Sequence, residues 1–252
     1  MAMDISITVL VVNFTAAHFI NATTDHSTPT GNLSSTTKHT PHSASWTLMP
    51  VYSLIVSVFG FVCNLTALVA FLRDRTLHTS SNIHIMNLLL VNVISTLTQR
   101  PLALLTSLYG GQWFLGPRAC DFYLYCNSLL GAAVLNTHGL IALNRAWAIV
   151  HPSSYRIRST KRLTLLVYFV LWIYLALQAM PAILQPSLDG KYAGCHYNNE
   201  GMEVYNIFID VAVYIIPVMV VWLSFIVVSV HKVDPQPIPQ STHRCRLLRG
   251  DQ

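Results

Sequence analysis

The chain has 252 residues, of which 53% are hydrophobic and only 10% are charged, and its formal net charge is +5. A soluble domain normally carries about 25% charged residues, so this composition argues against a soluble domain and for a membrane protein. The basic residues lie in short groups between apolar runs. Their excess therefore predicts membrane topology rather than nucleic acid binding.

The N-terminal segment, residues 1–47, is rich in Ser, Thr, His and Asn and shows no helical periodicity. Three N-glycosylation sequons begin at Asn13, Asn21 and Asn32. A segment of this composition cannot bury enough apolar surface to fold by itself. We therefore expect a disordered, glycosylated extracellular N-terminus.

Five windows without Asp, Glu, Lys or Arg follow along the chain. A helix needs roughly 20 apolar residues to cross the ~30 Å hydrocarbon core of a bilayer. The windows do not alternate apolar and polar residues, which excludes strands of a membrane β-barrel. The predicted fold class is an all-α membrane protein, a transmembrane helix bundle over residues 48–232. The predicted spans are 48–72, 82–109, 120–150, 163–184 and 204–230.

The orientation of the spans follows from Lys and Arg. Most of the 15 basic residues come after the first, third and fifth spans. Cytoplasmic loops carry such an excess, so these segments are predicted to be cytoplasmic. We expect a multi-pass plasma membrane protein with its N-terminus outside and a cytoplasmic tail, residues 233–252, that contains Pro and Arg.

The chain has five cysteines, and two of them, Cys120 and Cys195, are predicted to lie on the oxidising outer face. They are the predicted disulfide, which would join the third span to the following outer loop. No CxxC pair occurs, so a structural zinc site is not supported. No cofactor is predicted.

Motifs in the first three spans resemble those of the rhodopsin-like (class A) G-protein-coupled receptors. The pattern from Gly60 to Asn64 is similar to the family's helix-one asparagine motif, and the segment ending at Asn92 is similar to its helix-two motif. Trp113 and Cys120 resemble the outer-loop tryptophan and the helix-three disulfide cysteine.

The later motifs extend the resemblance over residues 48–232, the first five of the family's seven helices. Asn144, Arg145 and Ala146, with the following Pro152, resemble the Asp-Arg-Tyr motif and its proline. Trp172 and Pro217 match the helix-four tryptophan and helix-five proline. Two further apolar spans are not found, so we expect a truncated product or fragment of such a receptor.

Two departures from the family pattern have consequences. Asn92 replaces an aspartate that holds sodium in many members, so sodium is expected not to modulate ligand binding. Asn144 replaces the acid that would form a charge-assisted pair with Arg145, so the resting state is expected to hold Arg145 more weakly.

The resemblance also suggests candidate ligand residues. Asn127 takes the position at which amine receptors carry an aspartate, so a cationic amine is disfavoured and a peptide or other polar ligand is preferred. The alternative is that several candidates only pack or bond one another. The ligand-binding candidates are Arg100, Tyr123, Asn127, Gln178, Asp210 and Tyr214.

The resemblance implies a receptor that senses an extracellular ligand and couples to a heterotrimeric G protein. The alternative is a non-signalling membrane protein that associates with full-length receptors, as in a receptor oligomer. Transporters often show inverted repeats and broken helices, neither of which occurs here. No nucleophile motif or metal constellation stands out, so an enzyme is not expected.

Overall fold

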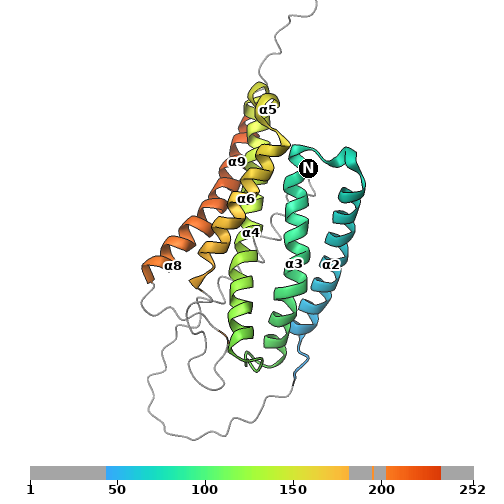
Figure 1. Cartoon of the computed structure of the whole chain (residues 1–252), viewed down its shortest axis with the longest axis vertical. Coiled ribbons are helices and arrows are strands. Elements are labelled where there is room, and N and C mark those ends of the chain that lie inside the picture. Colours follow the sequence, from blue (N-terminus) through green and yellow to red (C-terminus); the bar gives the residue numbers. More distant parts are fainter. Residues whose placement is uncertain (1–43, 182–194, 196–202, 234–252) are drawn as a thin grey trace, which may run out of the picture. The chain divides into compact units, whose positions relative to one another are not determined.

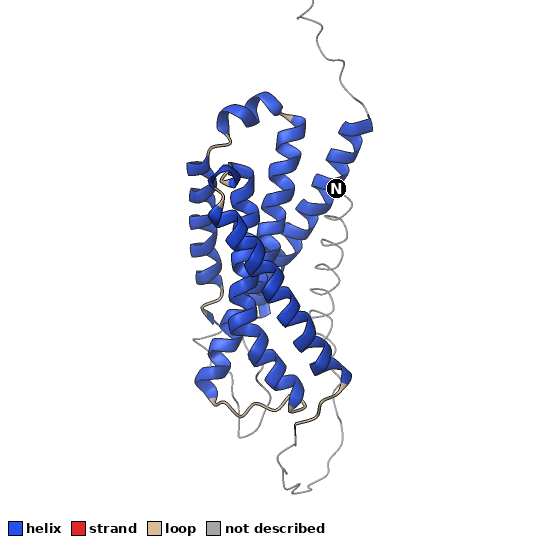
Figure 2. Cartoon of the chain, turned by 90° about the vertical axis from the view of Figure 1, so that its right-hand side faces the viewer, coloured by secondary structure: helices blue, strands red, loops and turns tan. Residues whose placement is uncertain are grey.

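The computed structural model describes residues 44–181, residue 195 and residues 203–233. The predicted glycosylation sites Asn13, Asn21 and Asn32 lie outside these residues, as does the tail 234–252. Within the described part every regular element is helical (Figure 2). Five helices are long and apolar enough to cross a membrane, so the predicted fold class is confirmed.

Four of the helices begin at residue types that are typical of a helix N-terminus. Thr79 and Thr160 precede two of the helices, and their side chains accept hydrogen bonds from the backbone N–H groups of Asn82 and Leu163. Pro117 and Pro152 open two others, at the position where a missing N–H costs nothing. The elements are α2 (Leu48–Arg73), η1 (Arg75–Leu77), α3 (Ser80–Leu108), α4 (Pro117–Val150), α5 (Pro152–Arg158), α6 (Lys161–Gln178), α8 (Glu203–Ile209), η2 (Asp210–Ile215) and α9 (Ile216–Val233).

Helix α6 covers only part of the predicted fourth span, 163–184, of which residues 182–184 lie outside the described residues. Helix α6 ends at Gln178, and Ala179 is its C-cap. Pro181 follows within three residues, and a proline disfavours helical backbone in the residue before it. Pro181, which the range 163–184 includes, therefore lies beyond the end of α6.

The fifth span, α8–η2–α9, contains a turn of π-helix over Asp210–Ile215 that the sequence did not predict. Pro217 has no N–H to donate to the carbonyl of Val213, four residues earlier, and its ring would clash with that carbonyl. The wider turn lies directly before Pro217. The Asn136 side chain of α4 donates a hydrogen bond to the Val213 carbonyl (3.1 Å).

Helix α4 lies at the centre of the bundle. Its most apolar 18-residue window is 39% buried, against 6% for that of α2. It packs against α3, α6, η2 and α9, whereas α2 packs mainly against α3 (Figure 1). The core around α4 combines residues of four spans: Val91, Cys126, Leu130, Ala132, Ala133, Leu175 and Val213.

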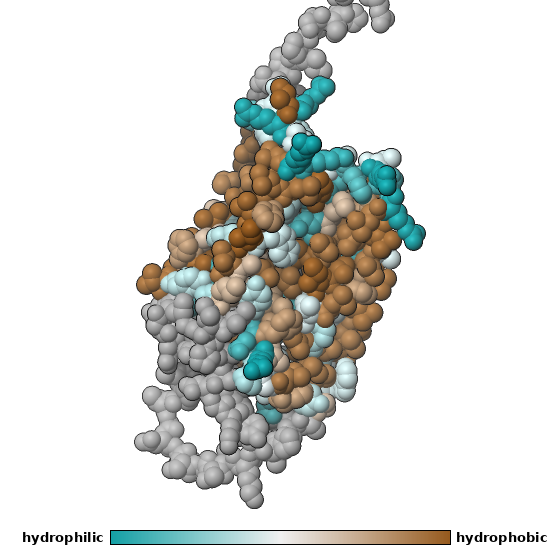
Figure 3. Space-filling view, viewed as in Figure 1, coloured by the Kyte–Doolittle hydropathy of each residue, from teal (hydrophilic) through white to brown (hydrophobic). Residues whose placement is uncertain are grey.

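The outer faces of α2, α6 and α9 are covered by exposed apolar side chains. Figure 3 shows this apolar surface as a brown band, with hydrophilic residues gathered at the end that holds η1 and α5. Exposing this many large apolar side chains to water would be unfavourable, whereas lipid tails solvate them. The distribution is that of a protein that crosses a membrane several times.

Candidate functional site

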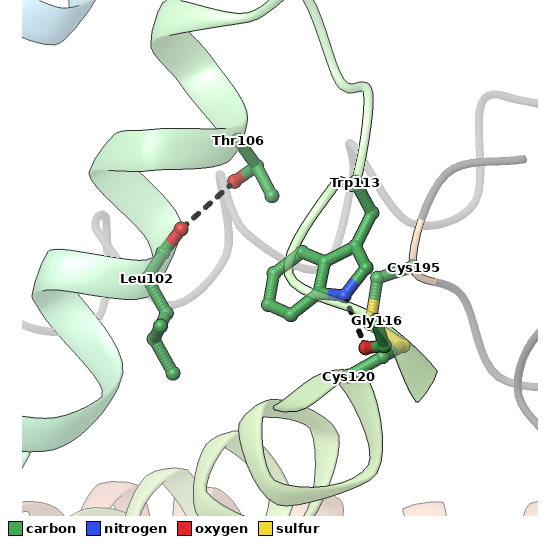
Figure 4. The surroundings of a disulfide bond; sticks show 6 residues. All are labelled: Leu102, Thr106, Trp113, Gly116, Cys120 and Cys195. Carbon is green, nitrogen blue, oxygen red and sulfur yellow. Dashed lines mark hydrogen bonds between the residues drawn. A yellow bond between two sulfur atoms is a disulfide. The ribbon is translucent and has the colours of Figure 1, made fainter. Parts of the chain in front are cut away.

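The end of the bundle opposite α5 is closed by the predicted disulfide, which the structure confirms. Cys120, in the first turn of α4, is bonded to Cys195, with a Cα–Cα distance of 5.6 Å (Figure 4). The two residues are 75 positions apart and both are buried. The bond therefore attaches the segment between α6 and α8 to the mouth of the central helix.

Trp113 fills the space beside this disulfide. Its indole N–H donates to the carbonyl of Gly116 (2.8 Å), as Figure 4 shows. Gly116 has φ +84°, a conformation that favours glycine, and it turns the chain into α4. Trp113 also stacks on Tyr123 of α4, with ring centroids 5.6 Å apart. This cluster fixes the position of Tyr123 at the mouth of the bundle.

The six ligand-binding candidates fall into two groups. In the first group, between α3 and α4, Arg100 lies close enough to Tyr123 for an electrostatic interaction. Asn127 accepts a hydrogen bond from the side-chain amide of Gln99, whose own oxygen accepts from Ser95 (2.9 Å). Asn127 is thus held by a neutral amide pair, and sequence reasoning had not singled out Gln99.

The second group joins α6 to α4 and the fifth span through Ser128. The Gln178 amide donates to the Ser128 hydroxyl (3.4 Å), and the Tyr214 side chain lies near the same residue. Asp210 lies near Tyr214. The Tyr205 hydroxyl donates to the Gln178 carbonyl (2.9 Å), which ties α8 to the end of α6.

A buried polar network crosses the middle of the bundle. Asn87 of α3 donates to the Thr137 hydroxyl (2.9 Å) and accepts from the indole N–H of Trp172 (3.1 Å). His84 and Tyr168 pair within 2.9 Å. These contacts join α3, α4 and α6, so Trp172 serves helix packing. The sequence did not identify the partners of Asn87.

Two asparagines connect α2 to α3. The Asn92 amide donates to Asn64 Oδ1 (3.1 Å), and the Asn64 amide donates to the carbonyl of Gly60 in its own helix (2.7 Å). In a membrane a buried amide must find such partners, because no water is available. The structure therefore places both residues in a helix–helix contact.

The opposite end of α4 carries Asn144, Arg145 and Ala146. Asn144 donates to the Ser81 hydroxyl of α3 (3.3 Å), so its side chain connects two helices, a contact that the sequence did not predict. Arg145 is exposed. Pro152 is the first residue of α5, and Tyr155 of that helix packs edge-on against Trp147 of α4 (5.4 Å between centroids).

The described part of the chain contains no group of three His, Cys, Asp or Glu side chains that could hold a metal ion. The polar residues instead form layers that connect the helices. The arrangement is that of a multi-helix membrane bundle with polar residues at both ends of its central helix.

Comparison with known proteins identifies a matching family. The model of the 7 transmembrane receptor (rhodopsin family) matches residues 63–246, well over half of the chain. The chain is 28% identical to melanopsin of Mus musculus over 193 residues, 74% of this chain and 37% of the mouse protein. It is 28% identical to Homo sapiens melanopsin (74% and 40% covered) and 29% identical to Melanopsin-A of Danio rerio (72% and 31% covered). The chain spans less than half the length of these curated relatives.

Proposed function

Because the chain belongs to the rhodopsin family of 7 transmembrane receptors, we propose that it senses an extracellular ligand and passes the signal to a heterotrimeric G protein. The position of the central helix α4 is the observation that supports the proposal. Helix α4 runs from the disulfide and Tyr123 at one end to Asn144 and Arg145 at the other, and it contacts five other helical elements. A change at either end of this helix is therefore transmitted to most of the bundle.

The proposed orientation places the disulfide end outside. Two independent observations support it. Disulfides form on the oxidising side of a membrane, and the opposite end carries the groups of Arg and Lys that mark a cytoplasmic face. The N-terminal segment, with its sequons, is then extracellular, and the segment after α9 is cytoplasmic.

The proposed ligand is a peptide or another polar molecule. Its binding residues combine a cation and a phenol between α3 and α4, Arg100 and Tyr123, with a carboxylate and a phenol of the fifth span, Asp210 and Tyr214. Groups of both signs suit a ligand with both donors and acceptors. Asn127 supplies no charge and pairs with Gln99, which argues against recognition of an isolated amine.

The proposed coupling residue is Arg145. It is exposed near the cytoplasmic end of α4, in the Asn-Arg-Ala sequence that occupies the place of the family motif. Asn144 directs its amide to Ser81 rather than offering a carboxylate. The neutral Asn144 side chain cannot offer Arg145 the charge-assisted pair that an aspartate at this position would provide, which favours basal activity.

The test measures G-protein activation in cells that make the full chain. Energy transfer between labelled Gα and Gγ would be recorded for each Gα class, first without ligand and then with a panel of peptides and carboxylated small molecules. We expect a loss of transfer that disappears in Arg145→Ala and persists in Arg118→Gln, which removes an exposed arginine from the opposite end of α4. Absence of any response with the chain at the cell surface would contradict signalling.

Co-expression with a full-length rhodopsin-family receptor separates signalling from association. A chain that acts only by association would give no response of its own and would reduce delivery of the full-length receptor to the surface. A chain that signals gives a response whose size is unchanged by the second receptor. Arg145→Ala is the control, because association through helix faces does not require this residue.

A further inference from the structure

A dense group of basic residues surrounds an exposed isoleucine at the α5 end of the bundle. The group, called here the basic rim, consists of Arg156, Arg158, Lys161 and Arg162, all exposed and all within seven positions. Ile157 lies among them with 78% of its surface exposed. An apolar side chain of this size, so exposed and so closely flanked by cations, is typical of an element that rests in the interface of a membrane.

The position of Ile157 relative to the helix bundle follows from hydrogen bonds that hold the α5–α6 connection. The Ser159 hydroxyl donates to Ser80 Oγ (3.1 Å), and Ser80 Oγ pairs with Thr164 Oγ1 of α6 (2.7 Å). Trp147 holds the other side of α5 through its contact with Tyr155. Helix α5 is thus fixed against the ends of α3, α4 and α6.

The boundary of the apolar surface lies directly beside the basic rim. Arg162 is exposed, and the next residue, Leu163, begins the apolar surface of α6 together with Leu165 and Leu166, which are 57% and 56% exposed. Figure 3 shows the same change from brown to teal at the end of the molecule that carries α5. The rim therefore lies at headgroup level.

The charge of the rim is not neutralised by nearby acids of the sequence. No Asp or Glu occurs between positions 122 and 188. At the same end Arg73 and Arg75 add two more exposed cations, and the Asp74 carboxylate between them accepts both of its hydrogen bonds from Thr76. The surface is thus complementary to an anionic one.

We propose that the basic rim and Ile157 form a docking surface for the headgroups of anionic phospholipids. The arginines and the lysine bind the phosphates, while Ile157 inserts between the first acyl carbons. Each Lys or Arg near an anionic membrane surface contributes about 1 kcal/mol, which corresponds to roughly a five-fold change in affinity. The surface thereby fixes α5, and with it the end of α4 that carries Arg145, relative to the membrane plane.

Native mass spectrometry of the full chain tests the proposal. The protein would be released from mixed micelles containing equal amounts of phosphatidylserine and phosphatidylcholine with identical acyl chains, and the ratio of the two bound lipids would be measured. We expect phosphatidylserine to be enriched. Arg158→Gln should lower the enrichment roughly five-fold, and Arg158→Lys should preserve it. Ile157→Ser should lower the amount of both bound lipids, whereas Ile157→Leu should not.

The matched control is Arg118→Gln, which removes an exposed arginine from the opposite end of α4. It should leave the ratio unchanged. Melting temperatures in phosphatidylcholine alone verify that each variant is folded. Equal binding of the two lipids, or an equal loss in Arg118→Gln, would overturn the proposal. The proposal would also be overturned if the basic rim bound an acidic protein segment instead of lipid. In that case phosphatidylserine would not be enriched, while Arg158→Gln would weaken binding of a purified G protein.

Discussion

The side-chain amide of Asn136 on α4 donates to the backbone carbonyl of Val213 on η2, at 3.1 Å. The same amide also donates to the carbonyl of Ala132 (2.9 Å). Pro217 has no N–H, so it cannot donate a hydrogen bond to the Val213 carbonyl. A side chain of one helix therefore supplies the donor that another helix lacks, in a region without water.

Replacing Asn136 by alanine should lower stability by about 1 kcal/mol, since the Val213 carbonyl loses this donor. The measurement is the apparent melting temperature in detergent. Pro217→Ala provides the matched test, because alanine at 217 restores an N–H that can reach Val213. In that background Asn136→Ala should cost less. An equal cost in both backgrounds would show that the Val213 contact does not explain the effect.

Loss of the disulfide should destabilise the bundle strongly. Cross-linking residues 75 positions apart restricts the unfolded chain by about 4 kcal/mol in the chain-entropy model. Cys195→Ser should therefore melt at a clearly lower temperature than the parent protein, and reductant should lower the melting temperature of the parent but not that of Cys195→Ser. Cys63→Ser removes an exposed thiol from α2 and serves as the control. Similar melting of both variants would contradict a structural role for this bond.

Asn87 and Trp172 should be energetically coupled. Asn87→Ala leaves the indole N–H of Trp172 and the fully buried Thr137 hydroxyl each without one partner, at a cost of about 1–3 kcal/mol. Trp172→Phe removes the donor, so the double variant should be less destabilised than the sum of the single ones. Trp222→Phe, on the exposed face of α9, should change stability by less than about 0.5 kcal/mol. Simple additivity in the cycle would refute the coupling.

Gly139 marks the close approach of α4 and α9. A Cβ added there would meet Pro217 Cβ at 3.6 Å, an ordinary contact, so Gly139→Ala should fit and gain up to about 1 kcal/mol from helix propensity. Gly139→Leu should instead push the helices apart and lower the melting temperature. Gly131 has nothing within 4 Å among the described residues, so Gly131→Leu is the control. Equal effects of the two leucines would exclude close packing as the cause.

The spans and the disulfide were predictable, because a membrane imposes length and apolarity on each helix and oxidation restricts which cysteines pair. The boundaries of α2 and α3 agree with the prediction within two residues. The π turn before Pro217 was not predicted, and the side chain that donates to its Val213 carbonyl comes from Asn136, a residue 77 positions away. The partners of Asn127 and Asn144 were missed for the same reason: which polar groups meet is decided by helix packing rather than by local sequence.

The unequal packing of the helices has a mechanical consequence. Helix α2 packs mainly against α3 and is joined to it by the Asn64–Asn92 hydrogen bond, whereas α4 contacts α3, α5, α6, η2 and α9. Force applied to the chain before α2 would extract that helix from the membrane in an early step of its own. The pulled chain reaches α4 only after α3 has been extracted. Extraction of α4 would then release α6 and α9 from their shared support, so it should be the point at which the remaining bundle loses its order.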